Sequence, residues 1–338
     1  MKLTTWLFRL CVVGLIIIVG IVFWYKHGKS AVIGNQQTAY YTVKSGASLS
    51  RVAQDLQDQG VIASAFHFKL MARFAGNKPV QAADYEFAPG LTVQEVYTDL
   101  IEGKSVSKER QVTLVEGLSL VQMADILQEE GIITSAEAYK KAATEGTERF
   151  NEEFPLLSAR PAGASLEGYL FPETYRFYPN SDVDTVIRRQ LATFSQQFDD
   201  AMRSQIAASG RTFHEFVILA SIVEKEVRHA DDMHVVAGIF ANRLEDGMAL
   251  QADSTVNYIT NSGRSRSTYT DLAIDSPYNT YKYAGLPKGP ISNPGLNALK
   301  AAADPADTPY YFFLTDEAGH VYYGKTLDEH NRNREKYL

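Results

Sequence analysis

Two glutamates near the end of an apolar segment are the residues best suited to chemistry. Glu224 and Glu226 lie in the segment 212–227, whose other side chains are mostly apolar. Thr212 followed by Glu215 is typical of a capping box, so we expect a helix to begin there. At about 100° per residue, Glu224 falls within the apolar stripe of this helix, and Glu226 points about 160° away from it.

An inward-facing carboxylate has two interpretations. Burying its charge costs several kcal/mol unless the group is paired, protonated or placed at a cleft. Glu224 is therefore either a paired or hydrogen-bonded structural group that holds the core together, or an acid whose raised pKa suits proton transfer. The helix pattern alone favours neither interpretation.

The composition is that of an ordinary folded protein. The chain has 338 residues, 45% hydrophobic and 11% aromatic, which suggests roughly two domains with cores of their own. Its formal net charge is -7, and its Lys and Arg residues are scattered. These features argue against nucleic acid as a partner.

The first 30 residues differ from the rest of the chain. The run from Leu10 to Trp24 carries no charge and is long enough to span a bilayer if Arg9 lies near the inner face. Trp6 and Trp24 are placed like interfacial anchors, and no convincing cleavage site follows. We therefore expect residues 1–30 to be a cytoplasmic tip and a single-pass anchor in the inner membrane, with the body on the periplasmic, extracytoplasmic side.

Several kinds of chemistry lack the residues that they need. The only cysteine, Cys11, lies in the apolar run, so the body cannot use disulfides, a thiolate nucleophile or cysteine-bound zinc. The seven histidines form no zinc-protease motif, and there is no nucleophile elbow, P-loop or dinucleotide fingerprint. We expect no metal and no cofactor. Carboxylate acid–base chemistry remains, which suits a glycosidic bond, and Glu224 fits the role of the acid better than Glu226.

A repeated unit follows the short polar linker 31–39. Residues 43–62 align with 114–133 at an offset of 71, with eight identities in twenty positions. Each segment predicts a strand, a glycine turn and a helix begun by serine. Such units can look alike because caps and amphipathic periods look alike, but this number of identities favours a true repeat. Residues 40–53 also resemble the opening half of a LysM module, a glycan-binding domain, so we expect a LysM-like α+β region over 40–150.

Residues 151–338 are expected to form a mixed α+β catalytic domain, which makes the whole chain α+β. The aromatic segment 165–177 could be a cleft wall that stacks on sugars, but a strand packed on a core is favoured. Helices are expected over 183–207 and 234–243, and a terminal hairpin near 310–323. The stretch 276–295 has too much glycine and proline for a regular element, so it predicts a rigid loop.

Six motifs in the C-terminal half occur in the order known from one family. They are Ala220-Ser221-Ile222-Val223-Glu224-Lys225-Glu226, Asn242-Arg243-Leu244, Leu250-Gln251-Ala252-Asp253, Ser276-Pro277-Tyr278-Asn279-Thr280-Tyr281, Gly285-Leu286-Pro287 and Asn293-Pro294-Gly295. The chain resembles the YceG-like family, whose best-known members are the MltG-type endolytic murein (peptidoglycan) transglycosylases. Ser254 and Lys288 stand where the family usually has proline, and both are interpreted as loop residues.

The resemblance implies a lyase. Glu224 would protonate the oxygen between N-acetylmuramic acid and N-acetylglucosamine and then accept the proton of the muramoyl C6 hydroxyl, closing a 1,6-anhydro ring. It also implies peptidoglycan strands as substrate and peptidoglycan polymerases, the penicillin-binding proteins, as partners near the membrane. Candidates for contacting sugars or orienting Glu224 are Gln251, Asp253, Ser254, Tyr278, Asn279 and Asn293. The two asparagines could equally be capping groups within the loops.

Two other functions remain open. One is a non-catalytic scaffold that binds peptidoglycan through its LysM-like modules. The other is a glycoside hydrolase that uses Glu224 as acid and Asp253 as base or nucleophile, which the separation of the two carboxyl groups would help to decide.

Overall fold

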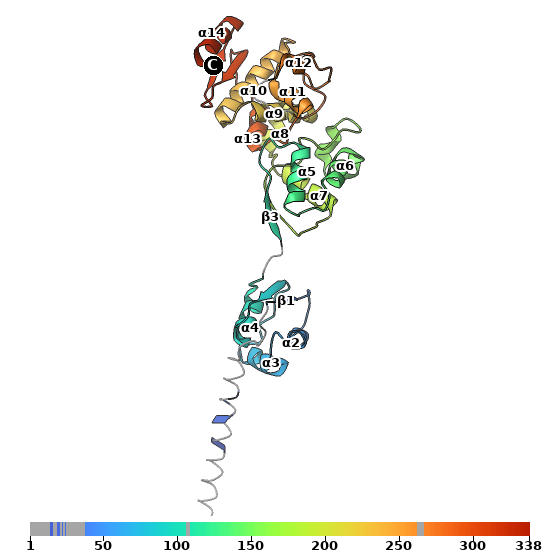
Figure 1. Ribbon diagram of the computed structural model, residues 1–338, viewed down its shortest axis with the longest axis vertical. Coiled ribbons are helices and arrows are strands. Elements are labelled where there is room, and N and C mark those ends of the chain that lie inside the picture. Colours follow the sequence, from blue (N-terminus) through green and yellow to red (C-terminus); the bar gives the residue numbers. More distant parts are fainter. Residues whose placement is uncertain are drawn as a thin grey trace, which may run out of the picture. The chain divides into compact units, whose positions relative to one another are not determined.

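The computed structural model describes residues 38–105, 109–261 and 267–338 continuously, together with residues 14, 15, 19, 20, 22 and 24. The chain divides into two compact units, Met1–Lys108 and Glu109–Leu338, each with its own hydrophobic core (Figure 1). The predicted anchor, residues 1–30, and most of the linker 31–39 lie outside the continuously described residues. Helices predominate, and the described strands form three antiparallel pairs. The predicted α+β class is therefore confirmed.

The N-terminal unit is a strand pair covered by three helices. Its elements are β1 (Ala39–Thr42), α2 (Leu49–Asp58), α3 (Ala65–Phe74), β2 (Asp84–Phe87) and α4 (Val93–Glu102). β1 and β2 are antiparallel, with Tyr41 opposite Tyr85. Apolar side chains of α2, α3 and α4 close over them, among them Leu56, Phe68 and Leu100, which are fully buried.

The C-terminal unit is larger. Its elements are β3 (Arg110–Thr113), α5 (Leu120–Glu129), α6 (Ala136–Thr144), η1 (Thr147–Phe150), η2 (Pro155–Ala159), β4 (Thr174–Phe177), α7 (Val183–Ser195), α8 (Asp200–Ala208), α9 (Phe213–Glu226), α10 (Ala230–Glu245), α11 (Asp253–Thr260), α12 (Tyr269–Leu272), α13 (Leu296–Ala303), β5 (Phe312–Thr315), β6 (Val321–Gly324) and α14 (Leu327–Tyr337). β3 pairs with β4 and β5 pairs with β6. The stretch predicted to be one helical region over 183–207 is two helices, and the predicted terminal hairpin is present.

The repeat predicted from the sequence is present as matching local structure. Ser48 caps α2 and Ser119 caps α5, each by accepting the backbone N–H three residues on. In each copy a glutamine near the end of this helix also holds the start of the next one. The side-chain oxygen of Gln57 accepts the N–H of Ala65 at 2.7 Å, and that of Gln128 accepts the N–H of Ala136 at 2.6 Å. Helix, turn and following helix are thus held by the same bonds in both copies.

The second copy belongs to the C-terminal unit. The boundary between the two compact units falls after Lys108 in the chain, whereas a LysM-like region extending to residue 150 was predicted from the sequence. The reason is long-range pairing: β3 takes β4 as its partner, with Thr113 opposite Thr174, and α6 packs on α7.

Helix α9 is the central helix of the C-terminal unit. It starts with the predicted capping box, in which Thr212 and Glu215 each accept the other's backbone N–H. His214 and every residue from Phe216 to Val223 are buried, because α10, α11 and α13 all pack on this helix (Figure 1). The helix therefore has more than one inward face, unlike the single stripe that the sequence pattern suggested.

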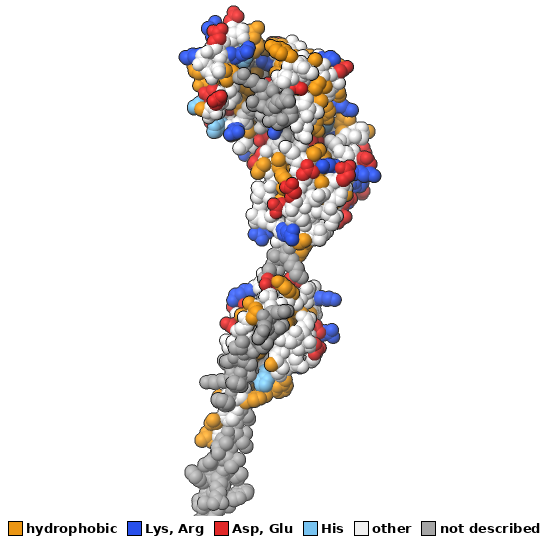
Figure 2. Space-filling view, in the orientation of Figure 1, with side chains coloured by type: hydrophobic (Ala, Val, Ile, Leu, Met, Phe, Trp, Pro, Cys, Tyr) orange, Lys and Arg blue, Asp and Glu red, His pale blue; other side chains and the backbone are white. Residues whose placement is uncertain are grey.

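Among the described residues, no single helix has both the length and the apolar composition needed to cross a bilayer. α8 and α9 meet these criteria only as a pair, with a bend of 99° between them. The segment 165–177 supplies core residues, including Leu166, Tyr169 and Leu170, as predicted, but only its last four residues, β4, form the expected strand. On the face shown in Figure 2, acidic and basic side chains are interspersed over the C-terminal unit.

The packing of α10 can be tested at Gly238. A Cβ atom added there would lie 2.1 Å from the carbonyl oxygen of Ala306. Gly238→Ala should lower the free energy of unfolding by about 1–3 kcal/mol, because this overlap outweighs the gain in helix propensity of about 1 kcal/mol. Thermal unfolding measures the change. Glu245→Ala, on the exposed side of the same helix, should stay within about 0.5 kcal/mol. A neutral or stabilising Gly238→Ala would contradict the contact.

Candidate active site

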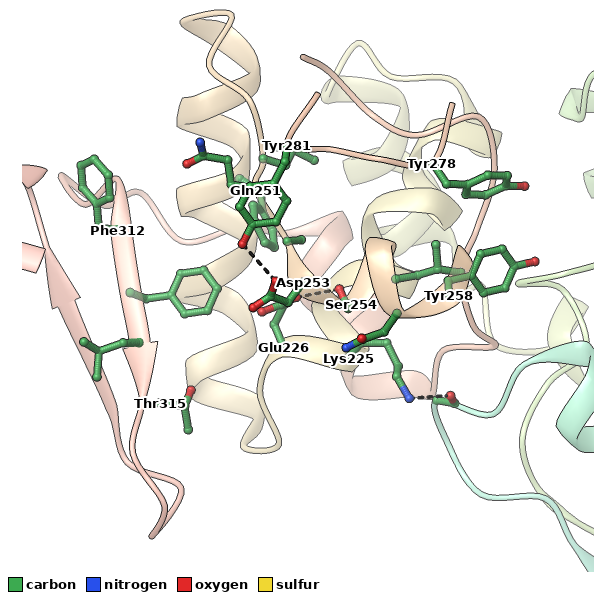
Figure 3. Close-up of a pocket in the computed structure, with 18 of the residues that line it drawn as sticks. Lys225, Glu226, Gln251, Asp253, Ser254, Tyr258, Tyr278, Tyr281, Phe312 and Thr315 are labelled. Carbon is green, nitrogen blue, oxygen red and sulfur yellow. Dashed lines mark hydrogen bonds between the residues drawn. The ribbon is translucent and has the colours of Figure 1, made fainter. Parts of the chain in front are cut away.

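An open cavity of about 1980 Å³ lies in the C-terminal unit (Figure 3). Its lining comes from the start of α5, the end of α9, the start of α11, the loop before α13, strand β5 and helix α14. The polar and aromatic lining residues include Ser119, Gln122, Lys225, Glu226, Gln251, Asp253, Ser254, Tyr258, Tyr278, Tyr281, Phe312 and Thr315. Such an open groove with tyrosines beside hydrogen-bonding groups suits an extended polar ligand.

Glu226 is the carboxylate of α9 that lines this cavity. It is the last residue of the helix and is partly buried. The hydroxyl of Ser254 donates to its Oε1 at 2.6 Å (Figure 3). Ser254 is the second residue of α11, so the carboxylate lies at the N-terminal end of that helix.

Opposing influences act on the pKa of Glu226. Burial raises it above the usual range, and the nearby Asp253 carboxylate raises it further. The hydrogen bonds from Ser254 lower it, as does the charge of Arg243. The net effect is upward, so Glu226 keeps its proton to higher pH than an exposed glutamate. This is what a general acid needs.

Glu224, the predicted acid, lies elsewhere. It does not line the cavity, and its Oε2 accepts the backbone N–H of Gly295, the N-cap of α13, at 3.0 Å. Burial raises its pKa to about 7, and the Glu116 carboxylate contributes to the rise. This placement matches the structural alternative left open by the sequence, a hydrogen-bonded glutamate between packed elements. The catalytic role of Glu224 stays a prediction that the geometry does not favour.

A sharp turn brings three of the predicted site residues into the cavity. Gln251 has a φ of 48°, a left-handed conformation that is uncommon for residues other than glycine. Thr280 holds the turn by accepting the N–H of Gln251 through its carbonyl oxygen and that of Ala252 through its hydroxyl. Gln251, Asp253 and Ser254 then follow one another along the cavity wall. Ser254 was interpreted as a loop residue, but it is helical and contacts Glu226.

Tyrosines form the rest of this wall. The hydroxyl of Tyr281 donates to Asp253 Oδ1 at 3.2 Å, which fixes that carboxylate beside Glu226 (Figure 3). The rings of Tyr258 and Tyr278 lie 5.1 Å apart and both line the cavity. Tyr278 was predicted as a site residue. Tyr258 and Tyr281 were missed, although Tyr281 belongs to a motif already identified.

The two predicted asparagines organise loops and do not line the cavity. The Asn279 amide donates to the carbonyls of Leu272 and Ile274 and accepts the N–H of Tyr281. Asn293 is fully buried. Both are thus the internal capping groups that the sequence analysis gave as the alternative to sugar contacts.

Strand β5 and α14 form the opposite wall. Phe312 and Thr315 lie across the cavity from Glu226 and Asp253 (Figure 3). Arg243 connects this wall to the turn at Gln251. Its guanidinium lies 5.2 Å from the Phe312 ring centroid, and it donates to the carbonyl oxygen of Tyr311, just before β5, and to that of Leu250, just before the turn. Periodicity could not reveal this wall, because it depends on where the terminal hairpin folds back.

These features define a class of protein. A carboxylic acid with a raised pKa, in an open cavity with tyrosine walls, is an arrangement suited to cleaving glycosidic bonds. Among the described residues, no group of three or more His, Cys, Asp or Glu side chains could hold a metal ion. The chemistry that the described site itself provides is proton transfer by carboxyl groups.

Comparison with known proteins identifies the family. The model of the YceG-like family matches residues 41–336, and the chain belongs to this family. It is 32% identical over 311 residues to an endolytic murein transglycosylase of Bacillus subtilis (strain 168), covering 90% of this chain and 86% of the relative. An endolytic murein transglycosylase of Streptococcus pneumoniae serotype 2 (strain D39 / NCTC 7466) is 28% identical over 313 residues, covering 86% of this chain and 57% of that protein.

A solved structure shows the same fold. The crystal structure of a putative YceG-like protein from Listeria monocytogenes matches with a TM-score of 0.61 and 30% identity. The match covers 88% of this chain and 99% of that one. The resemblance inferred from the motifs is therefore confirmed at the level of the family.

Ser254 offers a test of the site through the pH profile. Its hydroxyl lowers the pKa of Glu226, so Ser254→Ala should raise that pKa further. Activity that needs the protonated acid is lost as pH rises through the pKa. The falling limb of kcat/KM should therefore move to higher pH, by about one to two units for the loss of a hydrogen bond worth about 1.5–3 kcal/mol.

The matched control is Thr260→Ala, which removes a hydroxyl from the same helix that, among the described residues, bonds to helix carbonyls alone. It should leave the falling limb where it is. A limb that stays in place or moves to lower pH in Ser254→Ala would contradict the proposed contact between Ser254 and the acid.

Proposed function

We propose that this protein is a murein lytic transglycosylase in which Glu226 is the catalytic acid. The observation that carries the assignment is the position of Glu226: it lines the cavity, keeps a raised pKa and accepts a hydrogen bond from Ser254. The relatives named endolytic murein transglycosylases, one of them similar over 90% of this chain, support the same class of reaction. Peptidoglycan strands are then the substrate.

The reaction needs one carboxyl group that works twice. Protonated Glu226 gives its proton to the oxygen between N-acetylmuramic acid and N-acetylglucosamine, and the bond from that oxygen to the muramoyl C1 breaks. The muramoyl C6 hydroxyl attacks C1 and passes its proton to the Glu226 carboxylate. The new bond closes a 1,6-anhydro ring, no water is consumed, and the acid is protonated again.

The surroundings of Glu226 suit both steps. Burial favours the protonated form before the bond breaks. The hydrogen bond from Ser254 stabilises the carboxylate that exists between the two proton transfers. Asp253 is held by Tyr281 beside the acid, where its negative charge can stabilise the positive charge that develops at the sugar C1.

Exchanging the acid for its amide tests this assignment. Glu226→Gln keeps the shape of the side chain but cannot donate the proton, so activity on uncrosslinked peptidoglycan strands should fall about 10²- to 10⁴-fold. Mass spectrometry of the products is the measurement. The parent should release internal fragments that end in an anhydro sugar, lighter by one water than hydrolysis products.

Glu224→Gln is the matched control on the same helix. The activity of the Glu224→Gln variant should stay within about threefold of that of the parent, because Glu224 does not line the cavity. Folding raises the pKa of Glu224 from the usual glutamate value to about 7. The unfolded chain therefore loses this proton at lower pH than the folded protein, so the stability of the parent falls as pH rises between these two pKa values. Glutamine does not ionise, and the Tm of this variant relative to the parent should therefore be higher at pH 8 than at pH 5.

The other outcomes identify the competing functions. Activity lost in Glu224→Gln but kept in Glu226→Gln would restore Glu224 as the acid. Hydrated reducing ends would indicate a hydrolase that uses Asp253 as its second carboxyl group. Binding without cleavage by the folded parent would favour a peptidoglycan-binding scaffold.

The location of the protein is a further part of the proposal. The uncharged run from Leu10 to Trp24 supports a single-pass inner-membrane anchor with the body on the periplasmic side, where nascent strands and their polymerases are found. The first repeat, residues 43–62, then serves as a LysM-like glycan contact near the membrane.

Membrane fractionation tests the anchor. The full chain should stay in the membrane after alkaline carbonate extraction, and external protease should degrade its body in spheroplasts but not in intact cells. Replacing Leu15 and Val19 by Lys should release the chain from the membrane, because charged side chains at the bilayer centre are costly. Release of the unchanged chain by carbonate would argue against a spanning segment.

A further inference from the structure

Glu167 is a buried carboxylate that the proposed reaction does not use. It is 3% exposed and lies in the segment between η2 and β4. Burial raises its pKa to about 7. A buried carboxyl group is costly unless its surroundings satisfy it, so the identity of its partners shows what it stabilises.

Three segments of the C-terminal unit that lie far from Glu167 in the chain donate hydrogen bonds to its carboxylate. The backbone N–H of Leu120, the first residue of α5, donates at 2.9 and 3.1 Å to its two oxygens. The Asn293 amide, from the loop before α13, donates to Oε1 at 2.9 Å. The hydroxyl of Tyr258, on α11, donates to Oε2 at 3.3 Å.

Two of these partners belong to two different rims of the cavity. Tyr258 lines it on the α11 side, where its ring lies beside that of Tyr278. Leu120 lies between Ser119 and Val121, which line the cavity on the α5 side. A single buried group therefore holds a backbone atom of one rim and a side chain of the other.

Asn293 strengthens the connection on the α5 side. Its side-chain oxygen accepts the N–H groups of Gly168 and Leu170, which follow Glu167 closely in the chain. Its backbone accepts the N–H of Gly117 and donates to the carbonyl of Leu118, in the turn that precedes α5. The second repeat is thus fixed to the catalytic part of the unit through its glycine turn and the first residue of its helix.

We propose that Glu167 is a positioning residue that holds the α5 rim and Tyr258 at a fixed separation, so that the second repeat forms a binding surface for a sugar of the glycan strand. The sugar-facing groups on the α5 rim are Ser119, Val121 and Gln122. This inference rests on the proposed function, since it takes a glycan strand as the ligand of the cavity.

Strand binding without cleavage gives the most direct test. The full chain carrying Glu226→Gln is mixed with uncrosslinked peptidoglycan strands, and the dissociation constant is measured with and without a second substitution. Glu167→Leu leaves three donors without an acceptor and should weaken binding about tenfold, whereas Glu167→Gln keeps one acceptor oxygen and should weaken it about threefold. Val121→Ala, at an exposed side chain of the cavity lining, should weaken binding without changing Tm.

Tyr139→Phe separates positioning from general stability. The Tyr139 hydroxyl donates to the Gln190 side chain at 2.6 Å, and both groups are buried in the same unit away from the cavity lining. This variant also loses a buried hydrogen bond, but strand binding should stay within about twofold. Equal weakening in Tyr139→Phe and Glu167→Gln at the same loss of Tm would overturn the proposal.

A double-mutant cycle keeps the test valid if Glu167→Leu does not fold. Tyr258→Phe removes only the hydroxyl that donates to Glu167. If Glu167 acts by holding Tyr258, the Glu167→Gln and Tyr258→Phe effects on binding should be less than additive. Additive effects would refute the coupling. Failure of the parent to form anhydro products would instead refute the proposed function, because the binding measurements do not depend on the reaction.

Discussion

The burial of α9 on several faces is the constraint on which the site depends. A helix enclosed by three others can carry charged groups only where neighbouring elements supply hydrogen-bond donors. Both glutamates meet this condition at the start of another helix: Glu224 at Gly295, the N-cap of α13, and Glu226 at Ser254, near the start of α11. Helix N-termini favour negative charge, which offsets part of the cost of burial. Only the second position opens into a cavity.

The sequence predicted local structure well because its signals are local. The capping box at Thr212, the serine caps of both repeats and the rigid loop around Asn279 all depend on residues a few positions apart. The direction of a side chain towards a cavity depends on the whole helix environment. A single buried face would favour Glu224 as the acid, whereas α9 packs on several sides, and the cavity lies on the side of Glu226.

Long-range pairing limited what could be predicted about the units. The strand that opens the second repeat pairs with a strand 61 residues further along, between Thr113 and Thr174. No local pattern indicates such a partner, because a strand–turn–helix segment has the same sequence signature whichever strand it meets. The motifs nevertheless identified Gln251, Asp253, Ser254 and Tyr278, which the structure places together along the cavity.

The two repeats show how one local structure can serve two different surroundings. Their helices use the same serine caps and the same glutamine bonds, so the local fold imposes no difference between them. A Cβ atom at Gly46 would meet nothing within 4 Å, whereas one at the equivalent Gly117 would lie 3.4 Å from Lys225 and 3.5 Å from Glu224. The second turn has thus become part of the wall beside the site. What each repeat binds is therefore decided by the surface it faces, and similarity between their sequences cannot by itself assign both the same role.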